Sequence, residues 1–366
     1  MKALRDFLSS PKYLKSLADS LGSPVLAKWA IEDLKAGMPA SRTAWERAEA
    51  AASGGGPGIP KAWLMIIPNA NPIAIVYPLT LALRLGHKVY VRRTTSQSKA
   101  PDNLFLDFMH HKFHPQLELL APSYRLGQTP LPEDVEAILA YGSNDTIAAL
   151  KRLSSKPVQG FGDALCAAII SARDLKRDPH GTARLLVRDA LSLAQRGCMS
   201  VRTTVVLGKL GDHSRQEWLL DVRSKAHART RGALDAATET ALDHEVCAWI
   251  ARGAEILPRR ALDEPLVPYQ HEQVGPGLTL TAERPYVIPL TFSDNAAVTE
   301  VAAKLRVLLP TLRHLSLSSS LLREVESGSA GLEGLRLASL GYANRVPWDG
   351  THEGKPLFNL ERPSLA

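Results

Sequence analysis

The alternation of short apolar runs with a helical stretch constrains the fold of this chain more than any other feature of its sequence. Residues 63–67 read Trp-Leu-Met-Ile-Ile, with the length and composition of a buried strand, and residues 88–91 read Lys-Val-Tyr-Val. Between them, the apolar stretch 72–85 predicts a helix that ends at Gly86. A strand, a helix and a second strand in this order predict a βαβ unit of an α/β protein.

A second alternation follows further along the chain. Residues 135–140 predict a strand, Gly142 and Ser143 a turn, and residues 146–153 a helix. Such a turn, with Asn144 or Asp145 as a capping residue, directs backbone N–H groups of the helix toward the loop, where a diphosphate group can bind. Many strand-to-helix turns bind nothing, so the turn alone favours a phosphate site only weakly.

The composition narrows the classes of protein. With 366 residues and 45% hydrophobic content, the chain is long enough for about two domains. Lys and Arg outnumber Asp and Glu by 44 to 37, and this moderate excess of positive charge favours small anionic ligands, phosphorylated cofactors among them. A nucleic-acid partner is not expected, because basic residues form no clustered stripe and aromatic residues make up only 6% of the chain.

The three cysteines, an odd number at wide spacings, argue against a disulfide framework and indicate a reducing compartment. The N-terminus has no apolar signal core, and no apolar run approaches the roughly 20 residues that cross a bilayer, so we expect a cytoplasmic protein without a membrane partner. His110, His111 and His114 have no cysteine or carboxylate at zinc-ligand spacing, and no metal site is predicted. Residues 1–52 carry spaced apolar positions typical of two or three helices.

Cys198 is the strongest candidate for chemistry. It lies in the segment Gln195-Arg196-Gly197-Cys198-Met199-Ser200, directly before a β-rich run. A thiolate can accept an acyl group and pass it on as a reactive thioester, and Gly197 would let the backbone approach a substrate. Taken alone, a cysteine between a helix and a strand is more often a small buried hydrophobic residue. We expect the other two cysteines, Cys166 and Cys247, in the core.

Five short segments together resemble the aldehyde dehydrogenase superfamily. They occur in the family's order and at near spacing, and they are Ile66-Ile67-Pro68-Asn69-Ala70-Asn71-Pro72, Gly86-His87-Lys88-Val89-Tyr90-Val91-Arg92, Tyr141-Gly142-Ser143, Lys156-Pro157-Val158 and Gln195-Arg196-Gly197-Cys198. Within the superfamily the chain looks most like the acyl-CoA reductases related to the reductase subunit of the bacterial bioluminescence fatty acid reductase complex. These also have a C-terminal tail similar to residues 347–356, and the resemblance covers about residues 60–360.

The resemblance implies an α/β protein of the aldehyde-dehydrogenase-like fold, with a doubly wound nucleotide-binding domain and a catalytic α/β domain. We expect a helical lead-in over residues 1–55, the nucleotide-binding domain over 56–160, the catalytic domain over 161–345 and a tail over 346–366. The active site is expected in the crevice between the two domains.

The resemblance also implies residues for the cofactor. Gly142 and Ser143 match the turn that receives the cofactor diphosphate, and Glu283 is similar to the glutamate that holds the nicotinamide ribose. Arg92 falls near the adenosine ribose, and with Arg93 it would suit a 2′-phosphate, because a guanidinium group binds phosphate bidentately. The resemblance therefore favours NADPH over NADH, although adjacent arginines are equally typical of a solvated strand end.

The chain departs from the family pattern at two positions. Where aldehyde-oxidising members carry a glutamate that activates water, this chain has Gly160. An acyl intermediate on Cys198, which matches the family's nucleophile, would therefore persist instead of being hydrolysed. Where the family has its oxyanion asparagine, this chain has Ala70 between Asn69 and Asn71, and either asparagine could replace the missing donor.

Together these features predict NADPH-dependent reduction of an acyl thioester to the aldehyde through an acyl-cysteine. The expected partners are an acyl-CoA or an acyl-carrier thioester, and an acyl-activating synthetase and further copies of the chain are additional candidates. Two alternatives with the same fold stay open, a reductase of phosphate-activated acids such as glutamyl phosphate and an aldehyde oxidiser. A third alternative is a relative without catalysis that acts as a binding subunit.

Overall fold

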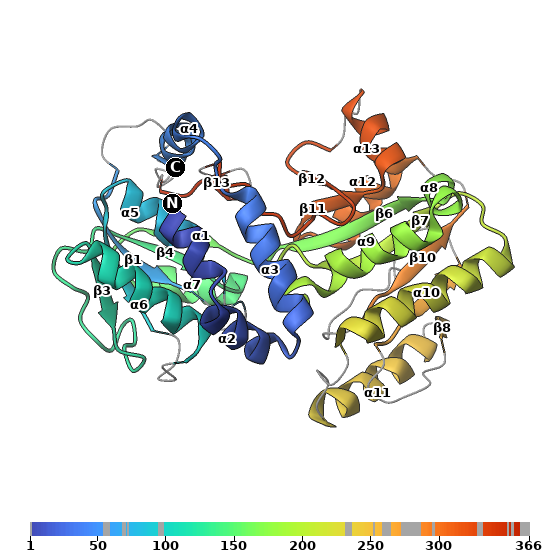
Figure 1. The fold of residues 1–366 in the computed structure, drawn as a ribbon, viewed down its shortest axis with the longest axis horizontal. Coiled ribbons are helices and arrows are strands. Elements are labelled where there is room, and N and C mark those ends of the chain that lie inside the picture. The colour runs from blue at the N-terminus through green and yellow to red at the C-terminus, as the bar shows by residue number, and fades with distance from the viewer. Residues whose placement is uncertain are drawn as a thin grey trace. The chain divides into compact units, whose positions relative to one another are not determined.

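The computed structural model alternates helices and strands and divides into two compact units (Figure 1). Unit 1 combines three chain segments, Met1–Ser20, Lys35–Asp163 and Pro347–Ala366, and unit 2 combines Leu21–Leu34 with Ala164–Val346. The residues that the structure describes are 2–53, 59–67, 71, 73–93, 99–230, 236–251, 253–257, 265–271, 287–294, 297–327, 332–349, 351–352 and 355–358.

The sheet of unit 1 has five strands in the order β3-β2-β1-β4-β5, and every neighbouring pair is parallel. The strands are β1 (Ala62–Ile66), β2 (Lys88–Arg92), β3 (Leu117–Leu120), β4 (Ala137–Tyr141) and β5 (Val158–Phe161). The chain winds from β1 outward to β3, then returns to β4 on the other side of β1 and continues to β5. This reversal is the topological switch of a doubly wound sheet, as predicted.

The predicted βαβ unit is confirmed at β1 and β2, which α5 (Val76–Arg84) connects. The helix α5 begins later than residue 72 and ends before Gly86, whose φ of +77° suits glycine. The second predicted strand and helix are present as β4 and α7 (Asn144–Leu153), and α6 (Pro101–Phe113) follows β2. The strands β1, β2 and β4 are buried along most of their length, which explains their nearly continuous apolar sequence.

Four helices precede β1, where the sequence predicted two or three. They are α1 (Lys2–Leu8), α2 (Pro11–Leu21), α3 (Pro24–Gly37) and α4 (Arg42–Ser53). Pro11 and Pro24 each stand at the first position of a helix, where the missing N–H costs nothing and the preceding helix cannot continue. The two prolines therefore divide a stretch whose apolar spacing alone predicts fewer helices.

The C-terminal tail packs on unit 1 through two aromatic side chains. Trp348 is 3% exposed, and its ring centroid lies 5.6 Å from that of Trp45 in an edge-to-face arrangement. Phe358 is fully buried, and its ring lies 5.3 Å from that of Trp63. Between them lies a short antiparallel pair, β13 (Thr351–His352) and β14 (Lys355–Pro356). Buried aromatic pairs contribute strongly to packing, so these tail residues are a structural part of unit 1.

The sheet of unit 2 has seven strands in the order β12-β11-β6-β7-β10-β9-β8. They are β6 (Leu165–Ser171), β7 (Val201–Leu207), β8 (Glu255–Ile256), β9 (Pro268–His271), β10 (Leu290–Ser293), β11 (Leu312–Leu317) and β12 (Arg336–Ser339). All neighbouring pairs are parallel except β8 and β9. The strands β6 and β7 are central and buried, as the apolar sequence of both segments predicts.

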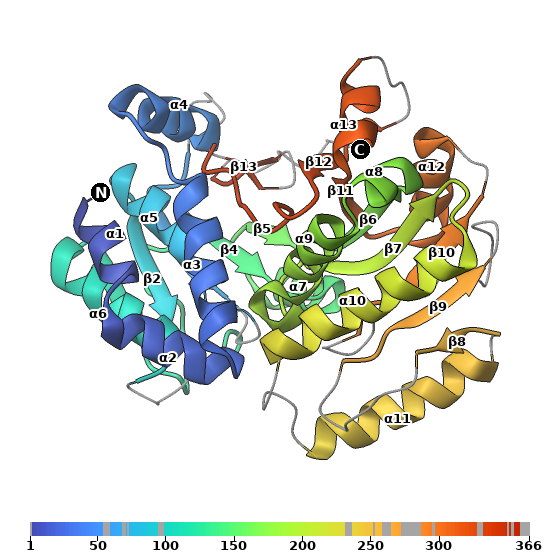
Figure 2. The same cartoon turned by 45° about the vertical axis from the view of Figure 1, so that its right-hand side comes forward.

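Helices pack on both faces of this second sheet (Figure 2). They are α8 (Ala172–Arg177), α9 (Pro179–Leu191), α10 (Asp212–Thr230), α11 (Ala236–Ala251), α12 (Val298–Leu308) and α13 (Ser319–Glu326). On β11, Leu315 and Leu317 join a core formed with α12 and α13, whereas Ser316 between them contacts α9. Side chains alternate between the faces of a strand, so α9 lies on the face opposite to α12 and α13. Within the described ranges, no helix has the length and apolar character needed to cross a membrane.

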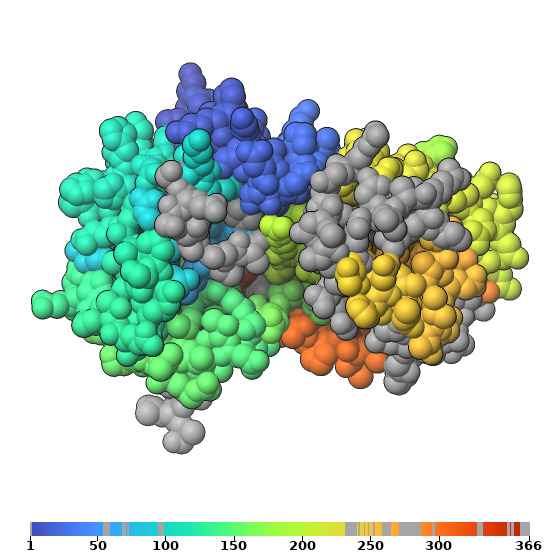
Figure 3. Space-filling model, turned by 90° about the horizontal axis from the view of Figure 1, so that it is seen from below, coloured from blue at the N-terminus to red at the C-terminus, as the bar shows by residue number. Residues whose placement is uncertain are grey.

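One of the two cysteines expected in the core is there, and the other is not. Cys166 lies on β6 and is 1% exposed, as predicted. The prediction for Cys247 was wrong, because this residue is exposed on α11, a helix that Figure 3 shows in gold at the surface. The buried side of α11 runs through Leu242, Val246 and Trp249. Cys247 lies about 100° around the helix from Val246, which turns it away from that side.

Candidate active site

Cys198 follows a left-handed turn of three residues that carry side chains. The helix α9 ends at Leu191, and the next turn contains Leu193, Ala194 and Gln195 with φ angles of +55°, +51° and +57°. A left-handed backbone brings Cβ close to the following carbonyl oxygen and costs about 1–2 kcal/mol per residue. All three residues are buried, so the surrounding structure must stabilise this conformation.

The side chain of Gln195 supplies part of that stabilisation. Its Nε2 donates to the carbonyl oxygen of Val287 at 2.6 Å, and its Oε1 accepts from the N–H of Val287 at 3.0 Å. The guanidinium group of Arg202, on β7, donates to the carbonyl oxygen of Gln195. These contacts therefore fix the turn through both the side chain and the backbone of Gln195.

Replacing Gln195 by alanine is expected to lower the free energy of unfolding by about 2–3 kcal/mol, because the buried N–H and carbonyl oxygen of Val287 each lose their hydrogen bond to Gln195. Urea denaturation followed by circular dichroism measures the difference. The control is Gln216→Ala, which removes a part-buried contact to Tyr269 Oη at 3.1 Å and should cost less than about 0.5 kcal/mol. Equal losses in the two variants would contradict the role of Gln195.

Cys198 is the most accessible residue of Gly197–Ser200, and Arg196 before them is exposed. Cys198 is half-buried, whereas the other three residues of this segment are buried. The hydroxyl of Ser200 donates to the carbonyl oxygen of Ser192 at 2.9 Å, and a Cβ added at Gly197 would lie 3.3 Å from Ser200 Oγ. Tight packing of the turn is thus a reason for glycine at position 197. Partial exposure is typical of reactive cysteines, in contrast to buried structural ones.

Cys166 provides this contrast within the same unit. Burial raises the pKa of the Cys166 thiol well above its usual value, and the charges of Asp189 and of a Cys198 thiolate act in the same direction, while Arg336 lowers it. Cys166 therefore stays protonated at neutral pH, and a buried protonated thiol is inert. Of these two cysteines, Cys198 is the one with access to a substrate.

In unit 1, the described candidates for cofactor and oxyanion contacts lie at the carboxyl ends of the strands. Arg92 is the last residue of β2, Gly142 and Ser143 follow β4, and Asn71 lies in the loop after β1. In a doubly wound sheet this edge, at the topological switch, is where ligands bind. The topology of unit 1 therefore brings these residues to the edge expected for a nucleotide.

The helix that follows β4 is already capped by side chains. The N-cap of α7 is Ser143, whose Oγ accepts from the N–H of Thr146 at 3.2 Å. The predicted capping residue Asn144 is instead the first residue of the helix. Asp163, which follows β5, accepts from the N–H of Asn144 through Oδ2 at 3.0 Å. A diphosphate at this helix end would have to displace the Asp163 carboxylate, a feature that the sequence analysis missed. The diphosphate role of Gly142 and Ser143 stays a prediction.

The two adjacent arginines at the end of β2 have different surroundings. Arg93 Nη2 forms an ion pair with Asp107 Oδ1 of α6 at 2.5 Å. Arg92 is half-buried, and burial together with the nearby guanidinium group of Arg125 lowers the pKa of Arg92. Arg125 Nη1 donates to the carbonyl oxygen of Pro122 at 2.7 Å. A guanidinium group can bind phosphate bidentately, and the 2′-phosphate role of Arg92 and Arg93 stays a prediction. Arg125 was not predicted, because no motif links it to β2.

The predicted oxyanion and ribose contacts are only partly within the described residues. Asn71 Oδ1 accepts from the N–H of Ile73 at 3.1 Å, which fixes the loop before α5. Asn69, Ala70 and Glu283 lie outside the described residues. The roles of Asn69, Asn71 and Glu283 therefore stay predictions.

Three rings also meet at the carboxyl edge of the unit 1 sheet. Tyr141 ends β4 and stacks on Phe161, which ends β5, with ring centroids 5.1 Å apart. His352 of β13 lies 5.1 Å from Tyr141 and 4.7 Å from Phe161. The tail thus reaches the residue directly before the turn at Gly142, which the sequence analysis did not anticipate.

No protein-family model and no curated protein matches the sequence. Solved structures match most of the chain. Aldehyde dehydrogenase 21 from Physcomitrella patens, in complex with the reaction product succinate, is 15% identical with a TM-score of 0.65, over 96% of this chain and 79% of that one. Succinic semialdehyde dehydrogenase from Streptococcus pyogenes, in complex with NADP+ as the cofactor, is 13% identical with a TM-score of 0.63, over 93% and 87%. An NAD-dependent benzaldehyde dehydrogenase from Corynebacterium glutamicum is 12% identical with a TM-score of 0.60, over 88% and 76%. The chain has an aldehyde dehydrogenase fold.

Within this aldehyde dehydrogenase fold, Gly160 lies on β5 and packs against α7. A Cβ built at Gly160 would lie only 2.2 Å from Ile147 Cγ2, a separation that real side chains do not adopt. A side chain at position 160 therefore requires a shift of α7 or of Ile147. A glutamate at position 160 would require the same shift.

Replacing Gly160 by alanine is expected to lower the free energy of unfolding by about 1–3 kcal/mol, the usual cost of overpacking a well-packed site. Gly211→Ala is a matched control, because a Cβ at Gly211 meets nothing within 4 Å. Thermal and urea denaturation of both variants measure the effect. A Gly160→Ala variant as stable as wild type would show that α7 yields easily at this point.

The aldehyde dehydrogenase fold distributes the described candidates over both units. Arg92, Gly142 and Ser143 belong to unit 1, and Cys198 belongs to unit 2. The expected crevice between two domains, the predicted domain boundaries and the acyl-CoA reductase subfamily stay predictions.

Proposed function

We propose that this chain reduces acyl thioesters to aldehydes with NADPH, through an acyl intermediate on Cys198. The observation that carries the proposal is the half-buried Cys198, which follows a strained and buried turn in an aldehyde dehydrogenase fold. Strained backbone and partial exposure of a thiol together are typical of functional sites. At the coarser level, the proposal is an oxidoreductase that uses a nicotinamide cofactor on aldehyde-related substrates.

The proposed chemistry places every covalent step on Cys198. Its thiolate attacks the thioester carbonyl, and the carrier leaves as a thiolate that takes up a proton. The acyl group then remains on Cys198 as a thioester. NADPH, when bound, supplies the hydride that reduces this acyl group. The resulting thiohemiacetal releases the free aldehyde and returns the cysteine thiolate.

The packing of Gly160 favours reduction over oxidation. An aldehyde oxidiser needs a base that activates water to hydrolyse the acyl-cysteine, and position 160 cannot carry a side chain without a clash with Ile147. Without such a base, the acyl group on Cys198 persists long enough to be reduced or transferred to a thiol. The aldehyde-oxidising alternative is therefore less well supported.

The surroundings of Arg92 support NADPH as the cofactor. Arg92 and Arg125 bring two positive charges together, which suits a terminal phosphate that NADH lacks. Of the similar structures, one was solved with NADP+ and another is described as NAD-dependent, so these relatives do not decide between the two cofactors. Asp163 already accepts from the N–H of Asn144 at the start of α7, so the turn at Gly142 and Ser143 gives less support for a bound diphosphate. We assign no catalytic step to that turn.

Replacing Arg92 by glutamine is expected to raise the Kd for NADPH about tenfold and to leave the Kd for NADH within about twofold, because one charge-assisted contact to phosphate is lost. Arg93→Gln is the matched control, since Arg93 is already paired with Asp107. Isothermal titration with both cofactors measures the change. Equal losses of NADPH and NADH affinity in Arg92→Gln would contradict a contact with the 2′-phosphate.

The proposed substrate is an acyl-CoA or an acyl-carrier thioester, made by an acyl-activating enzyme such as a synthetase in the cytoplasm. The net charge of +7 supports an anionic carrier of this kind. No nucleic acid or membrane partner is proposed, and homo-oligomers remain a candidate assembly.

Intact-mass spectrometry tests the proposed function directly. Wild-type protein is incubated with a series of acyl-CoAs of increasing chain length, and NADPH is then added. We expect a mass increase of one acyl group, located at Cys198 by peptide mapping, which NADPH discharges as free aldehyde. Acylation by an acyl phosphate but by no thioester would instead favour a phosphate-activated acid reductase. NADPH binding without acylation by either donor class would favour a binding subunit.

A further inference from the structure

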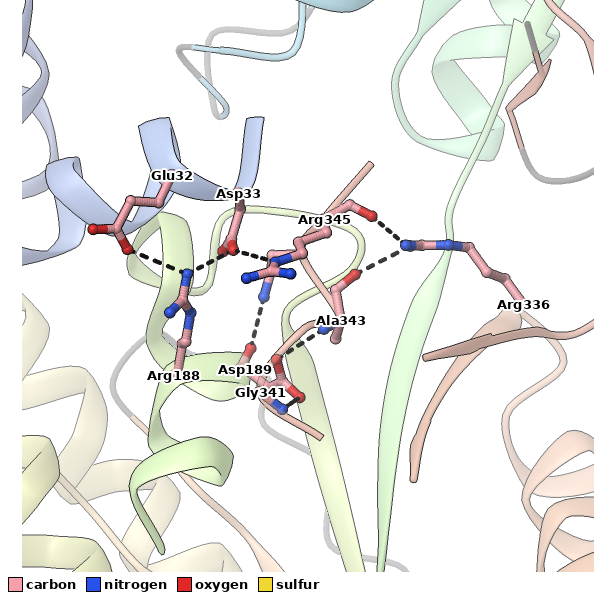
Figure 4. A network of polar contacts seen from close by, with 9 residues as sticks. Glu32, Asp33, Arg188, Asp189, Arg336, Gly341, Ala343 and Arg345 are labelled. Carbon is pink, nitrogen blue, oxygen red and sulfur yellow. Dashed lines mark hydrogen bonds and ion pairs between the residues drawn. The ribbon is translucent and has the colours of Figure 1, made fainter. Parts of the chain in front are cut away.

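We propose that Asp189 is a positioning residue that sets the orientation of Cys198 through the loop 340–345, an inference that rests on the proposed function of Cys198. Asp189 lies on α9, nine residues before Cys198, and is 1% exposed. Figure 4 shows its carboxylate turned toward this loop. Nothing in the proposed chemistry requires a buried carboxylate at this position, so its role must lie in its contacts.

The carboxylate of Asp189 accepts three hydrogen bonds. Its Oδ2 accepts from Ser316 Oγ at 2.6 Å and from the N–H of Gly341 at 2.7 Å, and its Oδ1 accepts from the N–H of Ala343 at 2.9 Å. The carbonyl oxygen of Asp189 also accepts from Asn344 Nδ2 at 3.1 Å. One residue of α9 therefore fixes three successive points of the loop.

The same loop contacts the residues on both sides of Cys198. Asn344 Oδ1 lies 3.4 Å from Ser200 Oγ and would lie 3.6 Å from a Cβ at Gly197. Asn344 is 6% exposed, so its amide is packed between α9 and the Cys198 segment. Any displacement of the loop thus reaches the residue before Cys198 and the second residue after it.

Arg336 links the loop to the remaining neighbour of Cys198. Its Nη1 donates to Met199 Sδ at 2.8 Å and to the carbonyl oxygen of Ala343 at 3.1 Å, and its Nη2 donates to the carbonyl oxygen of Arg345. Figure 4 shows this guanidinium group approaching the loop from the side opposite to Asp189. Arg336 and Asp189 therefore hold the loop between them.

The far end of the loop is anchored by a further carboxylate. Arg345 Nε donates to Asp33 Oδ1 at 3.5 Å, and Arg188 Nη2 of α9 donates to the same oxygen at 2.7 Å (Figure 4). The helix α9 thus binds the loop at both ends, directly through Asp189 and indirectly through Arg188 and Asp33. Contacts at both ends of the loop restrict its movement relative to α9 and the Cys198 segment.

A carboxyl group, with two oxygens that can accept, is the side chain that suits these donors. Two backbone N–H groups and one hydroxyl donate to the two oxygens of Asp189. An amide has only one oxygen, so its N–H₂ group would face one or more of these donors and lose their hydrogen bonds. Asp189→Asn therefore removes loop contacts at nearly constant volume. The expected change is a loosened loop in a folded protein, not a cavity.

The test compares Asp189→Asn with a matched control, Asp174→Asn. Asp174 lies in α8 and is 4% exposed. It accepts from the N–H and the hydroxyl of Ser320, each at 2.7 Å. Hydrogen–deuterium exchange reports on peptides that contain residues 197–200. Stopped-flow acylation reports kcat and KM for acyl-CoA. Both are measured at a temperature at which circular dichroism shows every variant folded.

We expect Asp189→Asn to raise amide exchange at residues 197–200 about tenfold and to lower kcat for acylation about tenfold, with KM within about twofold. Asp174→Asn should change neither. Iodoacetamide should still alkylate Cys198 in Asp189→Asn, since its thiol stays accessible but is no longer oriented. Unchanged exchange at residues 197–200 together with unchanged kcat would overturn the proposal.

Two further results separate this inference from the proposed function. If Asp189→Asn does not fold, Asn344→Ala keeps the carboxylate and removes the amide beside Gly197 and Ser200, and it should give the same loss of kcat and gain of exchange. If wild type is not acylated by any donor, the proposed function fails. The exchange data then still decide whether Asp189 positions the Cys198 segment.

Discussion

Replacing Cys198 by serine is expected to abolish acyl-enzyme formation and to lower the rate of aldehyde production by at least about 10³-fold. A serine hydroxyl is not ionised at neutral pH and needs an adjacent base to act as a nucleophile. Gly197 and Met199, the two residues beside position 198, carry no basic side chain that could take the proton of a serine hydroxyl. The variant should fold normally, because serine is close to cysteine in size. Rapid-quench mass spectrometry and NADPH oxidation measure the two losses.

Cys247→Ser is the control for this prediction. Cys247 is exposed on α11, so its replacement should change acylation and turnover by less than about twofold. Acylation that persists in Cys198→Ser and disappears in Cys247→Ser would move the nucleophile to α11. Acylation that persists in both variants would show that the acyl group is not carried by either thiol.

The free energy of unfolding is expected to fall as the pH rises from about 4 to about 7, by about 3 kcal/mol from Asp189 alone. Burial raises the pKa of Asp189 from 3.8 to about 7, against the hydrogen bonds from Ser316, Gly341 and Ala343, which lower it. Between these two pH values the native state retains a proton on Asp189 that the unfolded chain has released. Stability is therefore highest below the unfolded pKa and is lost as the pH approaches the folded one.

Urea denaturation of wild type and Asp189→Asn at a series of pH values isolates this contribution. The pH dependence of wild type minus that of the variant should show the fall, because the other carboxylates titrate in both proteins. Asp33 is an exception, because its charge also raises the pKa of Asp189. Identical pH profiles would mean that Asp189 is ionised in the native state throughout this range. A buried carboxylate that lowers the free energy of unfolding at neutral pH is typical of a residue kept for function at the expense of stability.

Much of the fold can be predicted from the sequence because it is encoded locally. The strands β1 and β2, the helix α5 and Gly86 all follow from runs of residues within one element. Helix boundaries were less predictable where single prolines decide them, as at Pro11 and Pro24. The prediction for Cys247 was wrong because two adjacent residues of a helix can lie on its buried and its exposed side.

The candidate site was predictable only in part, for a physical reason. The segment of Cys198 and the start of α7 near residue 144 depend on neighbouring residues and can be predicted from the sequence, although the N-cap is Ser143 and not Asn144. The pairs Gln195 with Val287 and Asp189 with Ala343 join residues far apart in the chain. Such pairs follow from the order of strands in a sheet, which the residues around Cys198 do not encode.

The tail of unit 1 has a consequence for synthesis of the chain. Trp348 and Phe358 cover Trp45 and Trp63, yet the whole of Ala164–Val346 must be translated before they leave the ribosome. At about 5–20 residues per second, translation of that segment takes on the order of 10–40 s. During this interval, the early part of unit 1 lacks the tail side chains that pack on Trp45 and Trp63. A chaperone that shields nascent apolar surface would therefore be needed most before the last residues are made.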